Sequence, residues 1–254
     1  MNLFLRELEA MDLDLILWTG DNTPHDVWAQ SQSYNLNFTS IISEYLRRHT
    51  KTRVIGAMGN HESFPVNVYD YQGQRETMLI GGLAEAWRPW LDEQAYQSLR
   101  TKGFFSISIP ELNNIKIISV NTQAQNDMNW FLLRDPTDPG GMLQWIEDEL
   151  KKSEKQGQFV YIIGHISPKS ALNDWSMRFN ALAERYSYII RGQFYGHSHR
   201  DHIGLIPEMG KKDKLTGFYF IAPSLTTYSD KNPEYRVMEV DYDSMQVLDY
   251  DQYR

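Results

Sequence analysis

Short apolar runs alternate along the chain with longer segments in which apolar residues recur every three to four positions. The short runs are typical of buried strands, and the longer segments are typical of helices that cover them. We expect strands at residues 13–18, 54–58, 104–109, 115–120, 159–163, 189–195, 202–206, 218–222, 235–241 and 246–250. We expect helices at residues 3–11, 25–48, 76–101, 142–156 and 175–187. Strand–helix alternation that ends in a strand-rich tail predicts an α/β architecture with two packed sheets flanked by helices.

Four of the predicted strands are followed by short polar blocks. A glycine in each block lets the backbone turn sharply, and residues at the carboxyl ends of strands in an α/β sheet meet at one edge. Asp, Asn and His bind divalent metals such as zinc through oxygen and nitrogen. The blocks are Gly20-Asp21, Gly59-Asn60-His61-Glu62, Gly164-His165 and Gly196-His197-Ser198-His199. Together, in this order, they predict a metal-dependent phosphoesterase.

Each block also has an ordinary structural explanation when it is taken alone. An Asp after a strand often caps a helix, and Gly59-Asn60 could be a turn. A lone His at a strand end is more often a hydrogen-bonded surface residue than a metal ligand. The joint pattern favours the metal site, because four strand ends supply metal-binding side chains. In addition, His197 and His199 can direct two imidazoles to one centre.

A two-metal hydrolytic centre also needs an acid that is not a metal ligand and that protonates the leaving oxygen. His61 directly follows the candidate ligand Asn60 and is the candidate acid, because histidine titrates near neutral pH. The alternative is that His61 only orients Asn60 from outside the metal shell. The residue types alone leave both interpretations open.

Composition narrows the classes of function. The 254 residues carry a net charge of −8, which argues against a surface for a nucleic-acid polymer. A phosphorylated substrate remains possible, because a bound dication reverses the local field. The chain has no cysteine, so it has neither disulfides nor thiolate ligands. No run reaches the roughly 18 apolar residues of a membrane span, and residues 1–9 predict an amphipathic helix and not a signal peptide.

The polar blocks resemble those of the calcineurin-like metallophosphoesterase superfamily. Longer stretches are similar to its acid sphingomyelinase and acid sphingomyelinase-like phosphodiesterase branch, and they cover nearly the whole chain. These stretches are Trp18-Thr19-Gly20-Asp21, His25-Asp26-Val27-Trp28, Gly59-Asn60-His61-Glu62-Ser63, Trp87-Arg88-Pro89-Trp90-Leu91, Thr137-Asp138-Pro139-Gly140, Gly164-His165-Ile166-Ser167-Pro168, Ala222-Pro223-Ser224 and Tyr235-Arg236-Val237. The resemblance implies a four-layer αββα sandwich, with residues 1–254 forming one catalytic domain.

The resemblance further implies two zinc ions. Asp21 would bridge them, and His199 would bind the second ion. The first ion would take three further ligands, namely Asn60, His165 and His197.

Three residues acquire substrate-related roles from the same resemblance. His61 matches the leaving-group acid, and His25 matches a second catalytic histidine near the substrate phosphate. Tyr228 lies in a stretch that lines the site in the family, although a packed core aromatic is an equal alternative for it.

The chain departs from the family pattern in one respect. The family has an Asp-x-His motif on its first core strand, and no such motif precedes Asp21. The first metal shell is complete without it, but the second keeps only Asp21 and His199, where tight sites use three or four protein ligands. We therefore expect one tightly held ion. The chain is expected to be an N-terminally incomplete copy of an active enzyme, lacking the first strand, or a short form with weak or no activity.

The leading functional hypothesis is hydrolysis of sphingomyelin to ceramide and phosphocholine by metal-activated water. A nucleotide or another small phosphodiester is the alternative substrate, which residues 192–201 favour by their similarity to the sphingomyelinase-like branch. A second alternative is a non-catalytic protein that binds one metal. The family resemblance implies a secreted or lysosomal location, and the sequence leaves the oligomeric state open.

Overall fold

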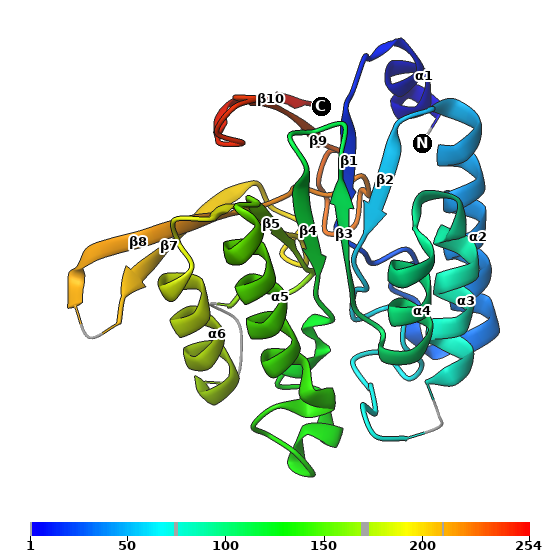
Figure 1. Cartoon of the computed structure of the whole chain (residues 1–254). Coiled ribbons are helices and arrows are strands. Elements are labelled where there is room, and N and C mark those ends of the chain that lie inside the picture. The colour runs from blue at the N-terminus through cyan, green and yellow to red at the C-terminus, as the bar shows by residue number, and fades with distance from the viewer. Residues whose placement is uncertain (1, 74–75, 169–172, 210) are drawn as a thin grey trace.

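The computed structural model describes residues 2–73, 76–168, 173–209 and 211–254 (Figure 1). Its helices are α1 Asn2–Ala10, α2 Gln32–His49, α3 Thr77–Trp87, α4 Glu93–Lys102, α5 Met142–Gln156 and α6 Asn173–Arg185. Its strands are β1 Leu15–Trp18, β2 Arg53–Gly56, β3 Phe105–Ile109, β4 Ile115–Ser119, β5 Val160–Ile163, β6 Ile190–Tyr195, β7 His202–Glu208, β8 Lys211–Ile221, β9 Tyr235–Val240 and β10 Val247–Tyr253. Every strand and helix expected from the sequence has a counterpart here.

The large sheet has the strand order β3-β4-β5-β6-β8-β7. Strands β4, β5, β6 and β8 run parallel, and the edge strands β3 and β7 run antiparallel to their neighbours. Strands β1 and β2 form a separate parallel pair, and β9 pairs antiparallel with β10. Helices α2, α3 and α4 lie outside β1 and β2, while α5 and α6 cover the opposite side of the large sheet (Figure 1). The predicted fold, sheets flanked by helices, is confirmed.

Both faces of the large sheet are buried. Ile117 and Ile163 belong to the core that the sheet shares with β1, β2 and α3, whereas Ile118 and Ile162 belong to the core under α5 and α6. Side chains of a strand alternate between its faces, so β4 and β5 supply apolar side chains to both cores. This explains why apolar residues dominate both strands, with Lys116 and Ser119 of β4 as buried polar exceptions.

The helix expected at 25–48 begins later, at Gln32. The side chain of Ser31 accepts a hydrogen bond from the backbone N–H of Tyr34 and so caps the helix. The residues before it form a loop with a short 3-10 helix at Val27–Ala29. The expectation was wrong here because the helical spacing of apolar residues extends upstream of the cap. The loop is important because it contains His25.

The helical region expected at 76–101 is divided into two helices. Pro89 lies in a 3-10 turn after α3, and the carboxylate of Asp92 accepts a hydrogen bond from the N–H of Ala95 to start α4. Strand β8 is also longer than expected and forms a hairpin with β7. Within the part of the chain that the structure describes, no helix has the length and apolar character needed to cross a membrane.

Candidate metal centre

Asp21 lies three residues after the end of β1, in a turn with left-handed backbone conformations. Gly20 and Asp21 both have positive φ, 86° and 62°. The loop after β2 lies against this turn so closely that a Cβ at Gly59 would be 2.1 Å from Oδ1 of Asp21. The backbone N–H of His61 donates to the same Oδ1 at 2.9 Å. Glycine at both positions therefore lets the two loops meet, and the meeting fixes one carboxylate oxygen of Asp21.

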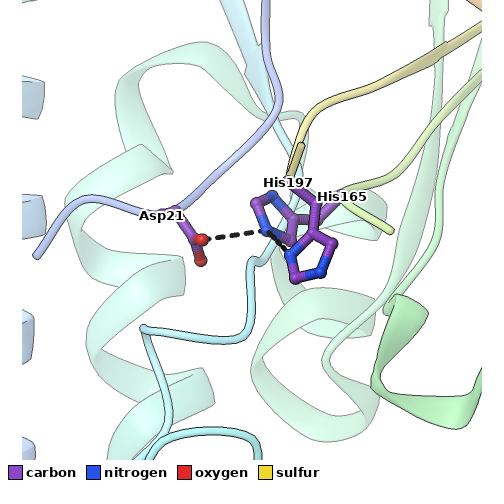
Figure 2. A group of neighbouring side chains, drawn as sticks. All are labelled: Asp21, His165 and His197. Carbon is purple, nitrogen blue, oxygen red and sulfur yellow. Dashed lines mark hydrogen bonds and ion pairs between the residues drawn. The ribbon is translucent and has the colours of Figure 1, made fainter. Parts of the chain in front are cut away.

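His165 follows β5 and is 2% exposed. Its Nδ1 lies 2.6 Å from the carbonyl oxygen of Thr19, so this nitrogen carries the proton and donates it. Its Nε2 lies 2.9 Å from Oδ2 of Asp21 and 3.3 Å from Nδ1 of His197. Figure 2 shows the three side chains converging in this way. A glycine is required nearby as well, because a Cβ at Gly196 would lie 2.8 Å from Oγ1 of Thr19.

Asn60 brings a second oxygen to the group. Its Oδ1 lies 3.0 Å from Nδ1 of His197, and its Nδ2 donates to Oδ1 of Asn67 at 3.0 Å. Asn126 donates to the same oxygen of Asn67 and also to Oε1 of Gln123. The orientation of the Asn60 amide is therefore set by a buried polar network that leaves its oxygen facing the histidines.

The four side chains fit a divalent metal ion. Donor atoms of Asp21, His165 and His197 all lie within 4.8 Å of one another, and Oδ1 of Asn60 contacts the last of them. Because Nδ1 of His165 donates to Thr19, a neutral His165 ring would direct the lone pair of Nε2 at a carboxylate. This arrangement is repulsive unless a proton or a cation lies between the two groups. Two imidazoles with carboxylate and amide oxygens form a donor set suited to zinc-like metals.

The electrostatics favour the metal-binding state of two ligands, Asp21 and His197, whereas the charge of Asp21 raises the pKa of His165 against the effect of burial. Burial by itself would raise the pKa of Asp21, but the charge and hydrogen bond of His165 hold the pKa of this carboxyl well below its usual range. Desolvation of the ring, together with the charge of His165, lowers the pKa of His197 to about 4. Asp21 is therefore ionised and His197 neutral near pH 7, as ligation requires.

A pocket of about 590 Å³ opens beside this group. His25, His61, His199 and Tyr228 line it together with Asp21 and His197. His25 stacks on Tyr228, with ring centroids 3.7 Å apart, and lies 4.3 Å from the ring of His61. Tyr228 is 48% exposed, which argues against the alternative of a packed core aromatic. The structure thus places all three predicted substrate-facing residues around one opening.

His199 is placed differently from the other predicted ligands. Its ring lies 5.2 Å from that of His25 and 6.0 Å from that of Tyr228, on the pocket wall. Among the described residues, the group whose donor atoms converge contains Asp21, His165 and His197 but not His199. Its role as a ligand of a second ion stays a prediction.

Glu62 is a residue whose contribution the sequence reasoning missed. It is 1% exposed, and its carboxylate accepts backbone hydrogen bonds from Asp21, Asn22 and Gly59. Burial and the charge of Asp21 raise its pKa to about 7. Glu62 therefore ties the loops after β1 and β2 together. The sequence signal that could have indicated this role is the position of Glu62 at the end of the Gly59-Asn60-His61-Glu62 block.

Comparisons with known proteins show which family the chain resembles. The family model of the calcineurin-like phosphoesterases matches residues 1–201. The chain is 36% identical to sphingomyelin phosphodiesterase of Bos taurus across 98% of its length, and 35% identical to that of Homo sapiens. It is 32% identical to cyclic GMP-AMP phosphodiesterase SMPDL3A of Homo sapiens across 96% of its length. A solved structure of PhoD superposes with a TM-score of 0.59 at 13% identity, covering 98% of this chain and 59% of that one.

This protein belongs to the calcineurin-like phosphoesterase family. The chain is similar to sphingomyelin phosphodiesterases and to the SMPDL3A phosphodiesterases. The chain spans 42% of the length of the bovine and human sphingomyelin phosphodiesterases and 56% of the length of human SMPDL3A. The family implies divalent metal ions, and the converging side chains of Asp21, His165 and His197 are the candidate site for one.

Proposed function

We propose that this protein hydrolyses phosphodiesters with a divalent metal ion held by Asp21, Asn60, His165 and His197, and that the ion is zinc. The observation that carries the proposal is the convergence of these oxygen and nitrogen donors at the edge of an open pocket. When bound, such an ion polarises a phosphoryl oxygen and lowers the pKa of a water molecule.

The chain's own residues supply the remaining chemistry. We assign His61 as the acid that protonates the leaving oxygen, because its ring lines the pocket and its backbone N–H is fixed on Asp21. Burial lowers the pKa of His61 in the free protein. A substrate phosphate beside the ring would raise that pKa again, because a nearby negative charge favours the imidazolium. The ring of His25, between His61 and Tyr228, is positioned to contact the same phosphate.

Sphingomyelin is the first candidate substrate, on the similarity to sphingomyelin phosphodiesterases. A residue of the loop that contains His25 supports a lipid. Trp28, three residues after His25, is 85% exposed. Indole rings favour the interface between water and lipid, so an exposed Trp28 is suited to contact with a membrane surface.

A small nucleotide phosphodiester is the second candidate. It is supported by the similarity to SMPDL3A and by two cationic side chains, Arg200 and Lys231, that line the pocket. A non-catalytic metal-binding protein is the remaining alternative. The secreted or lysosomal location stays a prediction from the family resemblance.

One assay series tests the proposal. The purified chain is incubated with zinc and offered sphingomyelin, ATP or bis-p-nitrophenyl phosphate, with metal content measured in parallel. We expect zinc-dependent release of p-nitrophenol and about one tightly held ion per chain, by the ligand count. Hydrolysis of the nucleotide without hydrolysis of sphingomyelin would rule out the lipid candidate. Absence of turnover at every zinc concentration, with the ion bound, would leave the binding-protein alternative.

A further inference from the structure

The pocket beside the metal centre is cationic in a chain that is acidic overall. Among the described residues that line it, Asp21 is the single carboxylate, whereas Arg200 and Lys231 are basic side chains. The whole chain has a net charge of −8. Asp21 itself faces His165 and the metal site, so its charge is compensated there. A concave surface of this kind concentrates field lines and attracts anions.

Lys231 is held in place beside the metal ligands. Its Nζ donates to the carbonyl oxygen of Ser198 at 3.3 Å, between His197 and His199 in the loop after β6. Lys231 is therefore attached to the pocket wall and its side chain is only half-buried.

Arg200 lies in the same loop and is exposed to the pocket. Among the ion pairs of the described residues, its guanidinium has no carboxylate partner, whereas the neighbouring Asp201 pairs with Arg236. The acidic neighbour is thus neutralised by another residue, and Arg200 keeps its charge available. A guanidinium without a partner is suited to bidentate binding of a phosphate.

The scissile phosphodiester carries a single negative charge, and the proposed function already assigns the metal ion and the pocket histidines to it. We infer that Arg200 and Lys231 determine specificity, by binding a second phosphate group that the substrate carries in addition to the scissile one. A nucleotide with a further phosphate and a lipid headgroup with a further phosphate share this chemistry. A trimethylammonium group would instead be repelled by the two cations. This inference rests on the proposed phosphodiesterase function and distinguishes between its two candidate substrates.

Two matched nucleotide probes test the inference. They are thymidine 5′-(4-nitrophenyl phosphate) and the same nucleotide with a 3′-phosphate; in both, water attacks phosphorus, the bond to the nitrophenyl oxygen breaks and nitrophenolate leaves. We expect the zinc-loaded protein to have the lower KM for the 3′-phosphorylated probe. Arg200→Gln and Lys231→Gln should each reduce the ratio of the two kcat/KM values by about tenfold, the effect of one lost charged contact. Arg178→Gln and Lys155→Gln, exposed cations on α6 and α5, should leave that ratio unchanged.

A binding measurement keeps the inference separate from catalysis. Calorimetry compares thymidine 3′,5′-bisphosphate with thymidine 5′-phosphate on the same zinc-loaded proteins. Co-sedimentation compares vesicles that contain phosphatidylinositol 4-phosphate with vesicles that contain phosphatidylinositol. Tighter binding of the ligand with the second phosphate in either pair, weakened by Arg200→Gln and Lys231→Gln, supports the inference. The pair that shows the preference tells whether the second phosphate belongs to a nucleotide or to a lipid headgroup. Equal binding in both pairs overturns it, whereas failure of both probes to turn over would count against the proposed function alone.

Discussion

Oδ2 of Asp21 and Nε2 of His165 lie 2.9 Å apart, although the two residues follow strands of different sheets. Asp21 comes after β1, in the two-stranded pair, and His165 comes after β5, in the large sheet. The candidate metal centre therefore lies where the two sheets meet and forms only when they pack.

Replacing Asp21 by Asn tests whether this junction holds the metal. The substitution keeps the shape but removes the charge that both the metal and His165 require. Asp21→Asn should weaken zinc binding by at least the ~10- to 100-fold that loss of an outer partner of a ligand costs. Competition with a chromogenic chelator measures the affinity. Asp251→Asn, an exposed carboxyl on β10, should bind zinc as the wild type does.

Gly59→Ala should impair the centre by steric means. The new Cβ would lie 2.1 Å from Oδ1 of Asp21 and 2.8 Å from Oε2 of Glu62, so the carboxylates must move. We expect weaker zinc binding and a destabilisation of about 1–3 kcal/mol, the usual cost of overpacking a buried site. In Gly81→Ala the Cβ meets nothing within 4 Å inside α3, so this variant should be stabilised by about 0.5–1 kcal/mol. Urea denaturation measures both changes in stability. If Gly59→Ala and Gly81→Ala changed the unfolding free energy equally, the close approach of Gly59 to Asp21 would be contradicted.

Glu62→Gln tests the connection between the two ligand loops. Both carboxylate oxygens accept backbone N–H groups, so the amide of Gln must direct its own N–H₂ at a donor. We expect a loss of about 1–3 kcal/mol of stability together with a lowered zinc affinity. Glu111→Gln, on an exposed turn, is the control in both measurements. If zinc affinity stays at the wild-type value while stability falls, Glu62 supports the fold but does not position Asp21.

His61→Ala separates an acid from a structural residue. Its imidazole is absent from the group of converging donors, so zinc content should stay nearly that of the wild type. Turnover of a phosphodiester with an alkoxide leaving group should fall by about 10²–10⁴-fold, the usual contribution of general acid catalysis, because an alkoxide, unlike nitrophenolate, needs a proton to leave. His49→Ala, in α2, should change neither quantity. Loss of zinc from His61→Ala would instead show that His61 organises the ligands.

Glu149 provides a pH-dependent test far from the pocket. Burial by itself would raise its pKa, but hydrogen bonds from Lys152 and Ser106 and the charge of the buried Lys116 lower it below 4.5. Its stabilising contribution is therefore complete above about pH 4.5, the value for a free Glu, and is lost as the pH falls through the folded pKa.

Glu149→Gln leaves the Lys116 ammonium without its partner and should cost about 3 kcal/mol at pH 7. The difference in unfolding free energy between this variant and the wild type should shrink as the pH falls below 4.5. Urea denaturation between pH 3 and pH 7 measures it. Glu147→Gln, more exposed on the same helix, should show a small difference at every pH. If the difference in unfolding free energy between Glu149→Gln and the wild type instead grew as the pH fell, the pKa of Glu149 would not be lowered in the folded protein.

The sequence by itself determined most of the elements and indicated candidate metal donors. Periodicity was sufficient for the strands because β4 and β5 are buried on both faces and are therefore mostly apolar. It misplaced the start of α2, because the apolar spacing continues past the cap at Ser31. Asp21, Asn60 and His165 could be named as candidate ligands because four glycine-containing blocks with metal-binding side chains follow strands of one chain.

Only the tertiary structure decided how those donors are held and what surrounds them. Glu62 joins the loops after β1 and β2, which lie side by side because the two strands pair, and local sequence does not encode that pairing. The proton of His165 is assigned by the carbonyl of Thr19, and the amide of Asn60 by Asn67, both contacts between distant segments. The cationic wall of Arg200 and Lys231 likewise arises only where the loop after β6 meets the loop after β8. The sequence gives the number of charged residues, but only folding decides which of them lie on the same surface.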